Sequence, residues 1–277
     1  MLNCKIICDS SSDLLTLSGA NFSCVPLKII TNEREYTDDC LLDVDGMIDD
    51  LQSYKGASQS SCPNTEDWKL AFEAYDCVFC VTLTSNLSGS YNAAQIALSE
   101  YLQEHPGRKG YVIDTLSAGP EVALVVEKLR DLILQGLCFD EIVEKIQTYM
   151  ASTHLLFSLE SLWNLANNGR VNMAVAKLTG LLGIRVIGKA SDEGTLAVIS
   201  KAKGEKKALK EVIKNMLLTG YQGGKVRIHH CRNLAAAETL QNAILKEYPH
   251  ASVIIEKTRG LCSFYAENGG LLIGYEA

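Results

Sequence analysis

The sequence lacks long apolar runs, a leader-like N-terminus and a long acidic tail. The longest apolar runs, such as 122–126, are far shorter than the roughly 18 residues that indicate a membrane-spanning helix. The chain begins directly on a strand-like segment, with no basic region followed by an apolar stretch and a cleavage site. Because the formal net charge is −7 and no basic stripe occurs, we expect neither nucleic-acid binding nor stable membrane insertion. These absences predict a cytoplasmic protein with reduced thiols.

Motifs for common catalytic and cofactor sites are also missing. There is no G-x-S-x-G elbow, no G-x-x-x-x-G-K-[ST] loop and no well-placed G-x-G-x-x-G, and the five histidines have no distinctive setting. Cys77 and Cys80 have the C-x-x-C spacing, but they lie in a strand-like apolar run without a second such pair. We interpret them, and Cys4 and Cys8, as small hydrophobic residues. The sequence therefore predicts no catalytic residue, no metal site and no cofactor.

Short apolar runs alternate with helical patterns through the first half of the 277-residue chain. This alternation is typical of βαβ units that form a mainly parallel sheet with helices on both faces. We expect strands at 5–8, 25–30, 77–82 and 110–113, and helices at 43–54, 65–75, 88–104, 118–135 and 139–150.

The pattern changes after residue 150. Two helices separated by 167–169 are expected first, then a hairpin of 184–189 and 195–200, a helix at 206–218, a strand at 225–230, a helix at 234–247, and strands at 251–256 and 271–275. With a boundary near Ser152, we predict an α/β fold of two domains. Residues 1–152 form the mainly parallel domain, and residues 153–277 form a mixed α/β domain.

Three segments place small polar residues at the expected carboxyl ends of strands, where open α/β sheets bind ligands. They are CDSSSD at 8–13, GASQSSCP at 56–63 and TSNLSGSY at 84–91. A helix start presents unpaired N–H groups and a positive dipole, so Ser88, Gly89 and Ser90 could hold an anion. The alternative is that Asn86 or Ser88 only caps the helix. The presence of three such segments favours a binding site.

A basic run, KAKGEKKALK, covers 201–210 and includes Lys203, Lys206 and Lys207. At helical spacing, such a run is either a solvated helix face or a docking patch for an acidic partner.

The order of these motifs resembles that of the DegV family of bacterial fatty-acid-binding proteins. IICDSSSDL is similar to the family's strand followed by D-S-[ST]-x-[DY]-L, and VPLKI is similar to its second strand. ASQSSCP resembles T-S-Q-P-S, LTSNLSGSYNAAQIA resembles S-x-x-[LI]-S-G-[ST]-Y, and VIDTLSAGPEVALVV resembles the D-[ST]-x-x-[AS] turn. LESLWNLANNGRV resembles the L-x-x-L-x-x-x-G-R-[IV] signature. The resemblance spans nearly the whole chain.

The resemblance implies that a long-chain fatty acid, similar to palmitate or oleate, lies in a tunnel between two α/β domains. The serine of S-G-[ST]-Y contacts the carboxylate in the family, and it falls on Ser88 here. Gly89 and Ser58 are the other expected carboxylate contacts. Ser61 and Tyr265 are expected to lie just behind them.

The resemblance also suggests a partner. Some family members present the carboxyl group to a separate ATP-using subunit of a fatty acid kinase, which forms an acyl phosphate. Lys203, Lys206 and Lys207 are the candidates for docking such a subunit. Arg170, from the G-R-[IV] signature, is expected to organise the domain junction or the partner surface.

Two segments depart from the family pattern at the polar end of the site. Ala57 replaces the threonine that begins T-S-Q-P-S, and Ser60 replaces its proline. Tyr265 or Ala266 stands where the family has a histidine in an H-[TL]-G-[PS]-G segment. A neighbouring serine, Ser58 or Ser61, is the candidate to supply the missing hydroxyl.

Three functional hypotheses follow. The first is a non-enzymatic protein that binds and carries a long-chain fatty acid in lipid metabolism. The second is a serine-dependent hydrolase or transferase that acts on a small acidic substrate, with Ser88 or Ser58 as nucleophile. The third is a binding module for another amphiphilic acid.

Overall fold

The computed structural model describes residues 3–72, 75–176 and 183–277. The strands are β1 (Cys4–Asp9), β2 (Asn21–Val25), β3 (Lys28–Thr31), β4 (Glu35–Thr37), β5 (Ser58–Ser61), β6 (Cys77–Thr82), β7 (Lys109–Asp114), β8 (Thr153–Leu159), β9 (Ile184–Ala190), β10 (Leu196–Lys203), β11 (Val226–His230), β12 (Val253–Lys257) and β13 (Leu271–Glu276). The helices are α1 (Val44–Ser53), α2 (Thr65–Phe72), α3 (Ser90–Glu104), α4 (Pro120–Leu134), α5 (Phe139–Met150), α6 (Trp163–Asn167), α7 (Met173–Ala176), α8 (Glu205–Leu218), α9 (Leu234–Glu247) and α10 (Gly260–Ala266), with a short 3-10 helix η1 (Ser10–Ser12).

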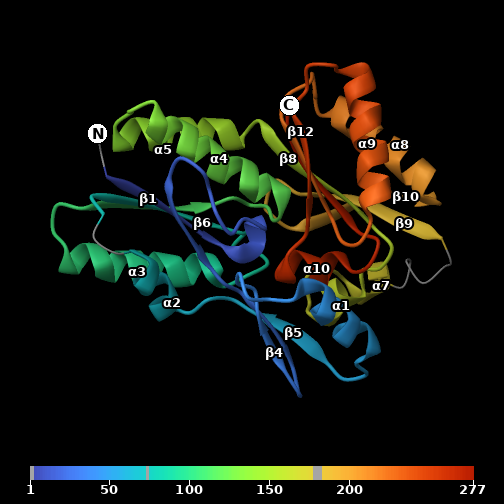
Figure 1. Ribbon diagram of the computed structural model, residues 1–277, viewed down its shortest axis with the longest axis horizontal. Helices are drawn as coiled ribbons and strands as arrows, with labels where there is room; N and C mark the ends of the chain where they lie inside the picture. The colour runs from blue at the N-terminus through green and yellow to red at the C-terminus, as the bar shows by residue number, and fades with distance from the viewer. Residues whose placement is uncertain (1–2, 73–74, 177–182) are drawn as a thin grey trace.

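A parallel sheet in the order β2-β1-β6-β7 forms much of the first half of the chain. Its side chains alternate between two cores. Ile6 and Phe79 pack with α4 and α5, whereas Ile7 and Val78 pack with α2 and α3. Figure 1 shows these two helix pairs on opposite faces of the sheet. Burial on both faces explains why β1 and β6 are almost continuously apolar, and the predicted parallel sheet with helices on both faces is confirmed.

A six-stranded mixed sheet, in the order β10-β9-β8-β13-β11-β12, forms most of the second half. The predicted hairpin is confirmed, because β9 and β10 pair in antiparallel register. Helices α8 and α9 pack on one face of this sheet. Helix α4 of the first half packs against β13, and a Cβ at Gly274 would lie 2.5 Å from the backbone nitrogen of Glu121. This glycine therefore permits direct contact between the helix and the second sheet.

One predicted strand, 25–30, is wrong as a single element. Pro26 has no backbone N–H and stands between β2, in the parallel sheet, and β3, in a small antiparallel sheet of order β4-β3-β5. β5 (Ser58–Ser61) is itself a strand of this small sheet, not a loop after a strand as the sequence suggests. Figure 1 shows β4 and β5 projecting below the two large sheets.

Further elements were not expected from the sequence, among them β4, β8 and α10. β8 and α10 are well-formed, and each lies between two expected elements. The two expected helices around 167–169 correspond to α6 and α7, while the end of the second one, at 177–182, lies outside the described residues.

The cysteine prediction is corrected in one respect. Cys4 and Cys77 are direct neighbours on β1 and β6, and they form a disulfide instead of remaining reduced. Cys8 and Cys80 are free and fully buried, as expected for small hydrophobic residues.

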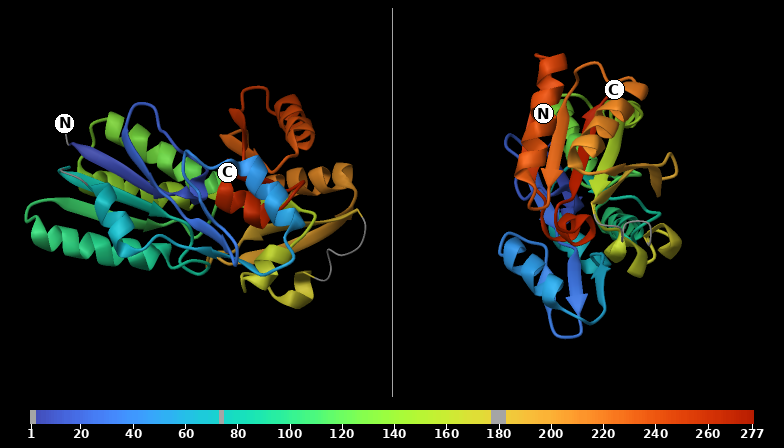
Figure 2. Two further views of the ribbon diagram at one scale, coloured as in Figure 1. Left: turned by 60° about the horizontal axis from the view of Figure 1, so that its bottom comes forward. Right: turned by 90° about the vertical axis from the view of Figure 1, so that its right-hand side faces the viewer.

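The hydrophobic cores do not all follow a division at residue 152. One cluster joins Ile29, Tyr36 and Met47 to Phe157 and Phe264, so the segment around the small sheet and α1 packs with the C-terminal half. Figure 2 shows α1 beside α10. The division into 1–152 and 153–277 stays a prediction. Within the described part of the chain, no helix has the length and apolar character needed to cross a membrane.

Candidate functional site

A cavity of about 310 Å³ lies where the parallel sheet, the mixed sheet and α10 meet. This volume is at the lower end of the range for small-molecule sites, roughly 300–1,000 Å³. Its lining is mostly apolar and comes from Leu27, Leu83, Leu87, Ala118, Leu155, Phe157, Leu159, Leu165, Leu196, Leu261, Ala266 and Leu272, with Cys62 and Cys262. The remaining lining residues are Ser60, Ser61, Ser88, Gly89, Arg170 and Tyr265.

Two of the three polar segments noted in the sequence reach this cavity. Ser60 and Ser61 come from β5, and Ser88 and Gly89 come from the turn between β6 and α3. The third segment forms η1, whose serines are buried but do not line the cavity. The turn before α3 therefore reaches the cavity from the carboxyl end of a parallel strand, β6, whereas β5 reaches it as a strand of the small antiparallel sheet.

The turn before α3 presents a hydroxyl and a backbone donor to the cavity. The Ser90 N–H donates to the Ser88 Oγ at 3.2 Å, so the Ser88 hydroxyl proton remains available to another acceptor. Gly89 is the N-cap and has no capping side chain, so neither Asn86 nor Ser88 occupies that position, although the Ser88 Oγ accepts the N–H of the first helical residue. No acceptor for the Gly89 N–H is found among the described residues. The turn can therefore donate two hydrogen bonds to an anion.

Tyr265 and Ser60 form a pair at the same cavity. Their hydroxyl oxygens are 2.6 Å apart, although the two residues are 205 positions apart in the chain. Burial raises the pKa of the Tyr265 phenol, and its hydrogen bond with Ser60 only partly offsets this effect. The phenol is therefore protonated near neutral pH and can act as a donor.

Arg170 connects several parts of this polar region. Its Nε donates to the Leu87 carbonyl oxygen at 3.2 Å, and its Nη1 donates to the Asn168 carbonyl oxygen at 2.5 Å. Its guanidinium carbon lies 5.8 Å from the centroid of the Tyr265 ring. Arg170 thus joins the turn before α3 to the segment after α6 and also lines the cavity.

Ser58, which the sequence predicts at the carboxylate, is not part of the cavity lining. Its carbonyl oxygen accepts a hydrogen bond from the Asn168 side chain at 3.2 Å. It lines a neighbouring surface pocket of about 410 Å³, which shares Ser60 and Arg170 with the cavity.

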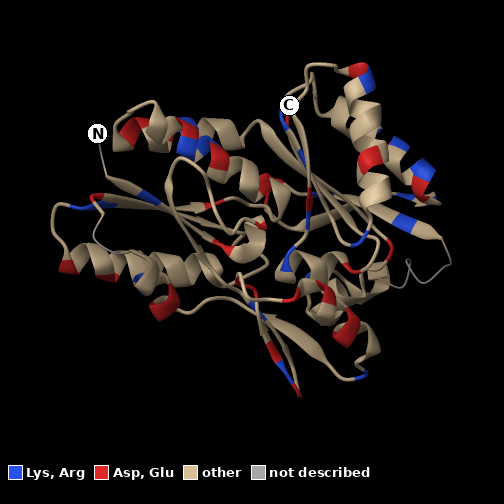
Figure 3. Cartoon of the chain, viewed as in Figure 1, with Lys and Arg blue, Asp and Glu red and all other residues tan. Residues whose placement is uncertain are grey.

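The lysines predicted for partner docking lie elsewhere, exposed at the end of β10 and on α8. Figure 3 shows basic residues on these two elements at the right of the view.

Part of the apolar wall escaped prediction because it belongs to the unexpected elements β8 and α10. The run HLLFSL in β8 was the available signal, since it contributes Leu155, Phe157 and Leu159. The position of α10 depends on distant residues. The Asp38 carboxylate accepts the N–H groups of Gly260 and Leu261 at 2.8 and 2.9 Å.

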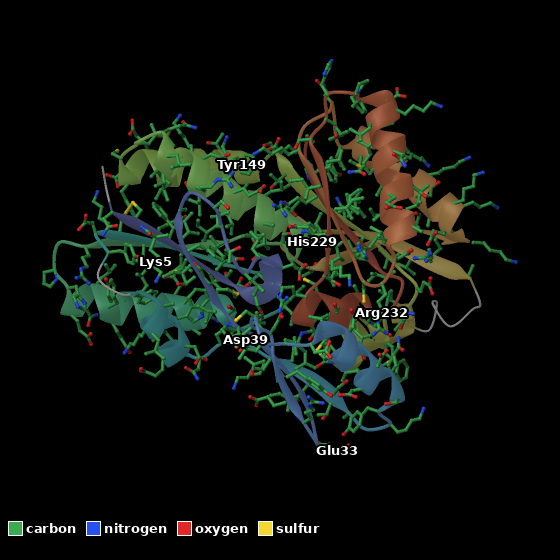
Figure 4. All side chains as sticks on the ribbon, viewed as in Figure 1. Lys5, Glu33, Asp39, Tyr149, His229 and Arg232 are labelled. Atoms are coloured by element: carbon green, nitrogen blue, oxygen red, sulfur yellow. A yellow bond between two sulfur atoms is a disulfide. The ribbon has the colours of Figure 1, made fainter. Side chains whose placement is uncertain are left out.

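A second buried contact supports α10. Asp13 accepts the Arg259 N–H at 2.7 Å and lies 2.7 Å from the Nδ1 of His229. His229 and His230 are both buried. Figure 4 shows His229 between the two large sheets. No histidine is found among the described residues that line the cavity, so the clustered serines have no imidazole base there.

The chemistry of the site follows from this arrangement. An apolar chain can be accommodated by the leucines, and an acidic group can receive hydrogen bonds where Ser88, Gly89 and Tyr265 lie. Among the described residues, no group of three or more histidine, cysteine, aspartate or glutamate side chains could hold a metal ion.

Comparisons with known proteins support a common architecture. A family model described as an uncharacterised protein of the DegV family matches residues 3–277. A DegV domain-containing protein of Streptococcus pneumoniae is 45% identical over 276 residues, which cover 98% of each chain. A DegV family protein from Eubacterium eligens, solved with heptadecanoic acid, is 43% identical with a TM-score of 0.97, and the match covers 99% of each chain. The fatty acid kinase (Fak) B3 protein of S. pneumoniae, solved with linoleic acid, is 44% identical with the same TM-score and the same coverage.

Proposed function

The chain belongs to the DegV family, and from this membership and the geometry of the cavity we propose that the protein binds a long-chain fatty acid. The observation that carries the proposal is the composition of the lining. Apolar side chains form most of the wall, and the few polar groups include Ser88, Gly89 and Tyr265, which can donate hydrogen bonds. The fatty acids in the two similar solved structures support the same assignment.

The energetics of such a ligand match this lining. A chain of about 15 methylenes gains roughly 0.8 kcal/mol for each methylene that leaves water, or about 12 kcal/mol before the costs of ordering the ligand. A carboxylate buried without hydrogen-bond donors would lose several kcal/mol of that gain. The protein must therefore supply a long apolar surface and a small number of donors at one place.

In this proposal the carboxylate accepts hydrogen bonds from the Ser88 hydroxyl and the Gly89 N–H. Tyr265, paired with Ser60, supplies a further donor, and Arg170 holds the turn that carries Ser88. Ser61 lines the same cavity and is a candidate for an additional contact. We place Ser58 outside the direct contacts because its side chain does not line the cavity.

We further propose that the protein carries the fatty acid in the cytoplasm and presents its carboxylate to a separate ATP-using kinase subunit. The similarity to the fatty acid kinase B3 protein supports this role. Phosphoryl transfer is then performed by the partner, so this chain needs neither a catalytic residue nor a cofactor. The exposed Lys203, Lys206 and Lys207 are the candidate docking residues.

Native mass spectrometry of freshly purified protein tests the binding proposal. We expect a bound mass that organic extraction identifies as a long-chain fatty acid, and uptake of palmitate or oleate after delipidation. Absence of both results would refute the proposal. Extraction of a different amphiphilic acid would favour the third hypothesis derived from the sequence.

Paired serine variants test the placement of the carboxylate. Ser88→Ala should weaken palmitate binding by about tenfold, because it removes a hydrogen bond to a charged group. Ser58→Ala is the matched control and should bind palmitate like the unsubstituted protein. Equal losses in the two variants would contradict this placement. Labelling of Ser88 by a serine-reactive phosphonate would instead support the hydrolase hypothesis.

Charge reversal tests the docking residues. The variant that combines Lys203→Glu, Lys206→Glu and Lys207→Glu should bind palmitate normally but yield less acyl phosphate with a fatty acid kinase subunit and ATP. Normal acyl phosphate formation would exclude this docking surface, and parallel loss of palmitate binding would indicate misfolding.

A further inference from the structure

Asp9 ends β1 as a fully buried carboxylate with several hydrogen-bond donors. Its Oδ1 accepts the Ser11 hydroxyl at 2.5 Å and the Ser11 N–H at 3.3 Å. Its Oδ2 accepts the Leu83 N–H at 3.1 Å and the Ser90 hydroxyl at 2.7 Å. All four of these donors are neutral groups. Burial raises the pKa of the Asp9 carboxyl, and these hydrogen bonds oppose that increase.

The Leu83 and Ser90 contacts lie on either side of the turn before α3. Leu83 follows β6 directly, and Ser90 is the first residue of α3. Ser90 uses its hydroxyl to bind Asp9 and its N–H to bind the Ser88 Oγ. A single residue therefore connects the buried carboxylate to the hydroxyl that faces the cavity. Asp9 itself does not line the cavity.

We propose that Asp9 is a positioning residue for the ligand carboxylate, because it fixes through Ser90 the turn that presents Ser88 and Gly89. This inference rests on the proposed fatty-acid binding. Asp9 holds the end of β6 and the start of α3 at a fixed separation, and this constraint sets where the two donors of the turn lie. Donors of a binding site need such support, since a displacement of about 1 Å is enough to weaken their hydrogen bonds.

A purely structural role for Asp9 makes a different prediction. If Asp9 only stabilised the fold, breaking its link to α3 would affect the binding of any ligand of the same chain length to the same degree. A positioning role affects only ligands whose head group uses the turn. The ratio of the affinities for palmitate and for hexadecan-1-ol separates the two roles, because the tails are equal in length and only the acid carries a negative charge.

The experiment measures both affinities by displacement of a fluorescent fatty acid from the full chain. In Ser90→Ala, the preference for palmitate over hexadecan-1-ol should fall by about tenfold, as expected for the weakening of one hydrogen bond to a charged group. Ser90→Cys keeps a weak donor of similar size and should lose less of the preference. It also provides a folded variant if Ser90→Ala is too unstable to purify.

Ser117→Ala is the matched control, because the Ser117 hydroxyl also donates to a buried carboxylate, that of Glu121, but Ser117 does not line the cavity. It should keep the preference for palmitate. An unchanged preference in the folded Ser90 variants, or an equal loss of affinity for acid and alcohol, would overturn the assignment of Asp9. Failure of the unsubstituted protein to bind palmitate would instead refute the proposed function itself.

Discussion

Glu121 provides a sharp test of the electrostatics of this fold. It lies in the first turn of α4 and is only 6% exposed. Its carboxylate accepts hydrogen bonds from the hydroxyls of Ser117 and Thr153, the latter at 2.8 Å. Burial raises the pKa of Glu121 to about 7, and the two hydroxyls only partly oppose this increase. We predict that Glu121→Gln raises the free energy of unfolding relative to the unsubstituted protein, and that this gain is larger at pH 8 than at pH 4.

The sign and size of this effect follow from proton linkage. Between an ordinary pKa of 4.5 and a folded-state pKa of about 7, the folded chain retains a proton that the unfolded chain has lost. Stability therefore falls as the pH rises through this range and levels off above it. At 1.36 kcal/mol for each pKa unit, the total loss is about 3 kcal/mol. Glutamine has nearly the same size, does not ionise and can bond to both hydroxyls, so the variant should escape this loss.

Urea unfolding of both proteins at several pH values between 4 and 8 measures the effect. The difference in unfolding free energy, variant minus unsubstituted protein, should increase by about 3 kcal/mol from pH 4 to pH 8. A pH-independent effect of the substitution on the free energy of unfolding shifts this difference equally at every pH. The test is therefore the change of the difference with pH. If the difference in unfolding free energy does not change with pH, the charged form of Glu121 does not destabilise the folded protein.

Three further predictions follow from the structure. Because Cys4 and Cys77 form a disulfide, alkylation of the denatured protein should label eight of the ten cysteines before reduction and all ten afterwards. Mass spectrometry counts the labels, and ten labels without reduction would contradict the disulfide. Leu155→Trp adds bulk to the cavity wall on β8, so displacement assays should show a larger loss of affinity for an 18-carbon acid than for a 12-carbon acid; equal losses would contradict binding of the chain along this wall. Asp38→Ala removes the acceptor of two buried N–H groups of α10 and should lower the free energy of unfolding by about 3 kcal/mol in urea titrations, whereas the exposed Asp192→Ala should have little effect.

The parts of the fold that could be predicted are those encoded by local patterns. The apolar runs of β1, β6 and β7 and the helices between them identified the parallel sheet, because each pattern reports burial within one short segment. The turn ASDEG between two short apolar runs identified the β9 and β10 hairpin in the same way. The location of Ser88 and Gly89 at the cavity also followed from a local feature, the change from strand to helix.

The parts that could not be predicted depend on contacts between distant residues. The start of α10 is held by Asp38, which is 222 positions from Gly260 in the chain, and no pattern within seven helical residues reports such a contact. β5 consists of serines and a glutamine, and it becomes a strand because it pairs with β3. Its polar sequence gives little strand signal, since β propensity reflects packing against neighbours more than the residue itself.

The two segments that depart from the family pattern each contribute one residue to a hydrogen-bonded pair in the structure. Ser60 replaces a proline of the family pattern, and Tyr265 or Ala266 stands where that pattern has a histidine. The hydroxyl oxygens of Ser60 and Tyr265 are 2.6 Å apart. A proline at position 60 would remove this hydrogen-bond partner from the half-buried phenol. The serine therefore stabilises the tyrosine at the position where a ligand carboxylate is proposed to bind. Ala57, which replaces a threonine of the family pattern, is exposed and does not line the cavity. The absence of the threonine hydroxyl therefore leaves the pair of Ser60 and Tyr265 intact. The polar end of the site is best understood as an altered set of donors in which Ser60 and Tyr265 act as one unit.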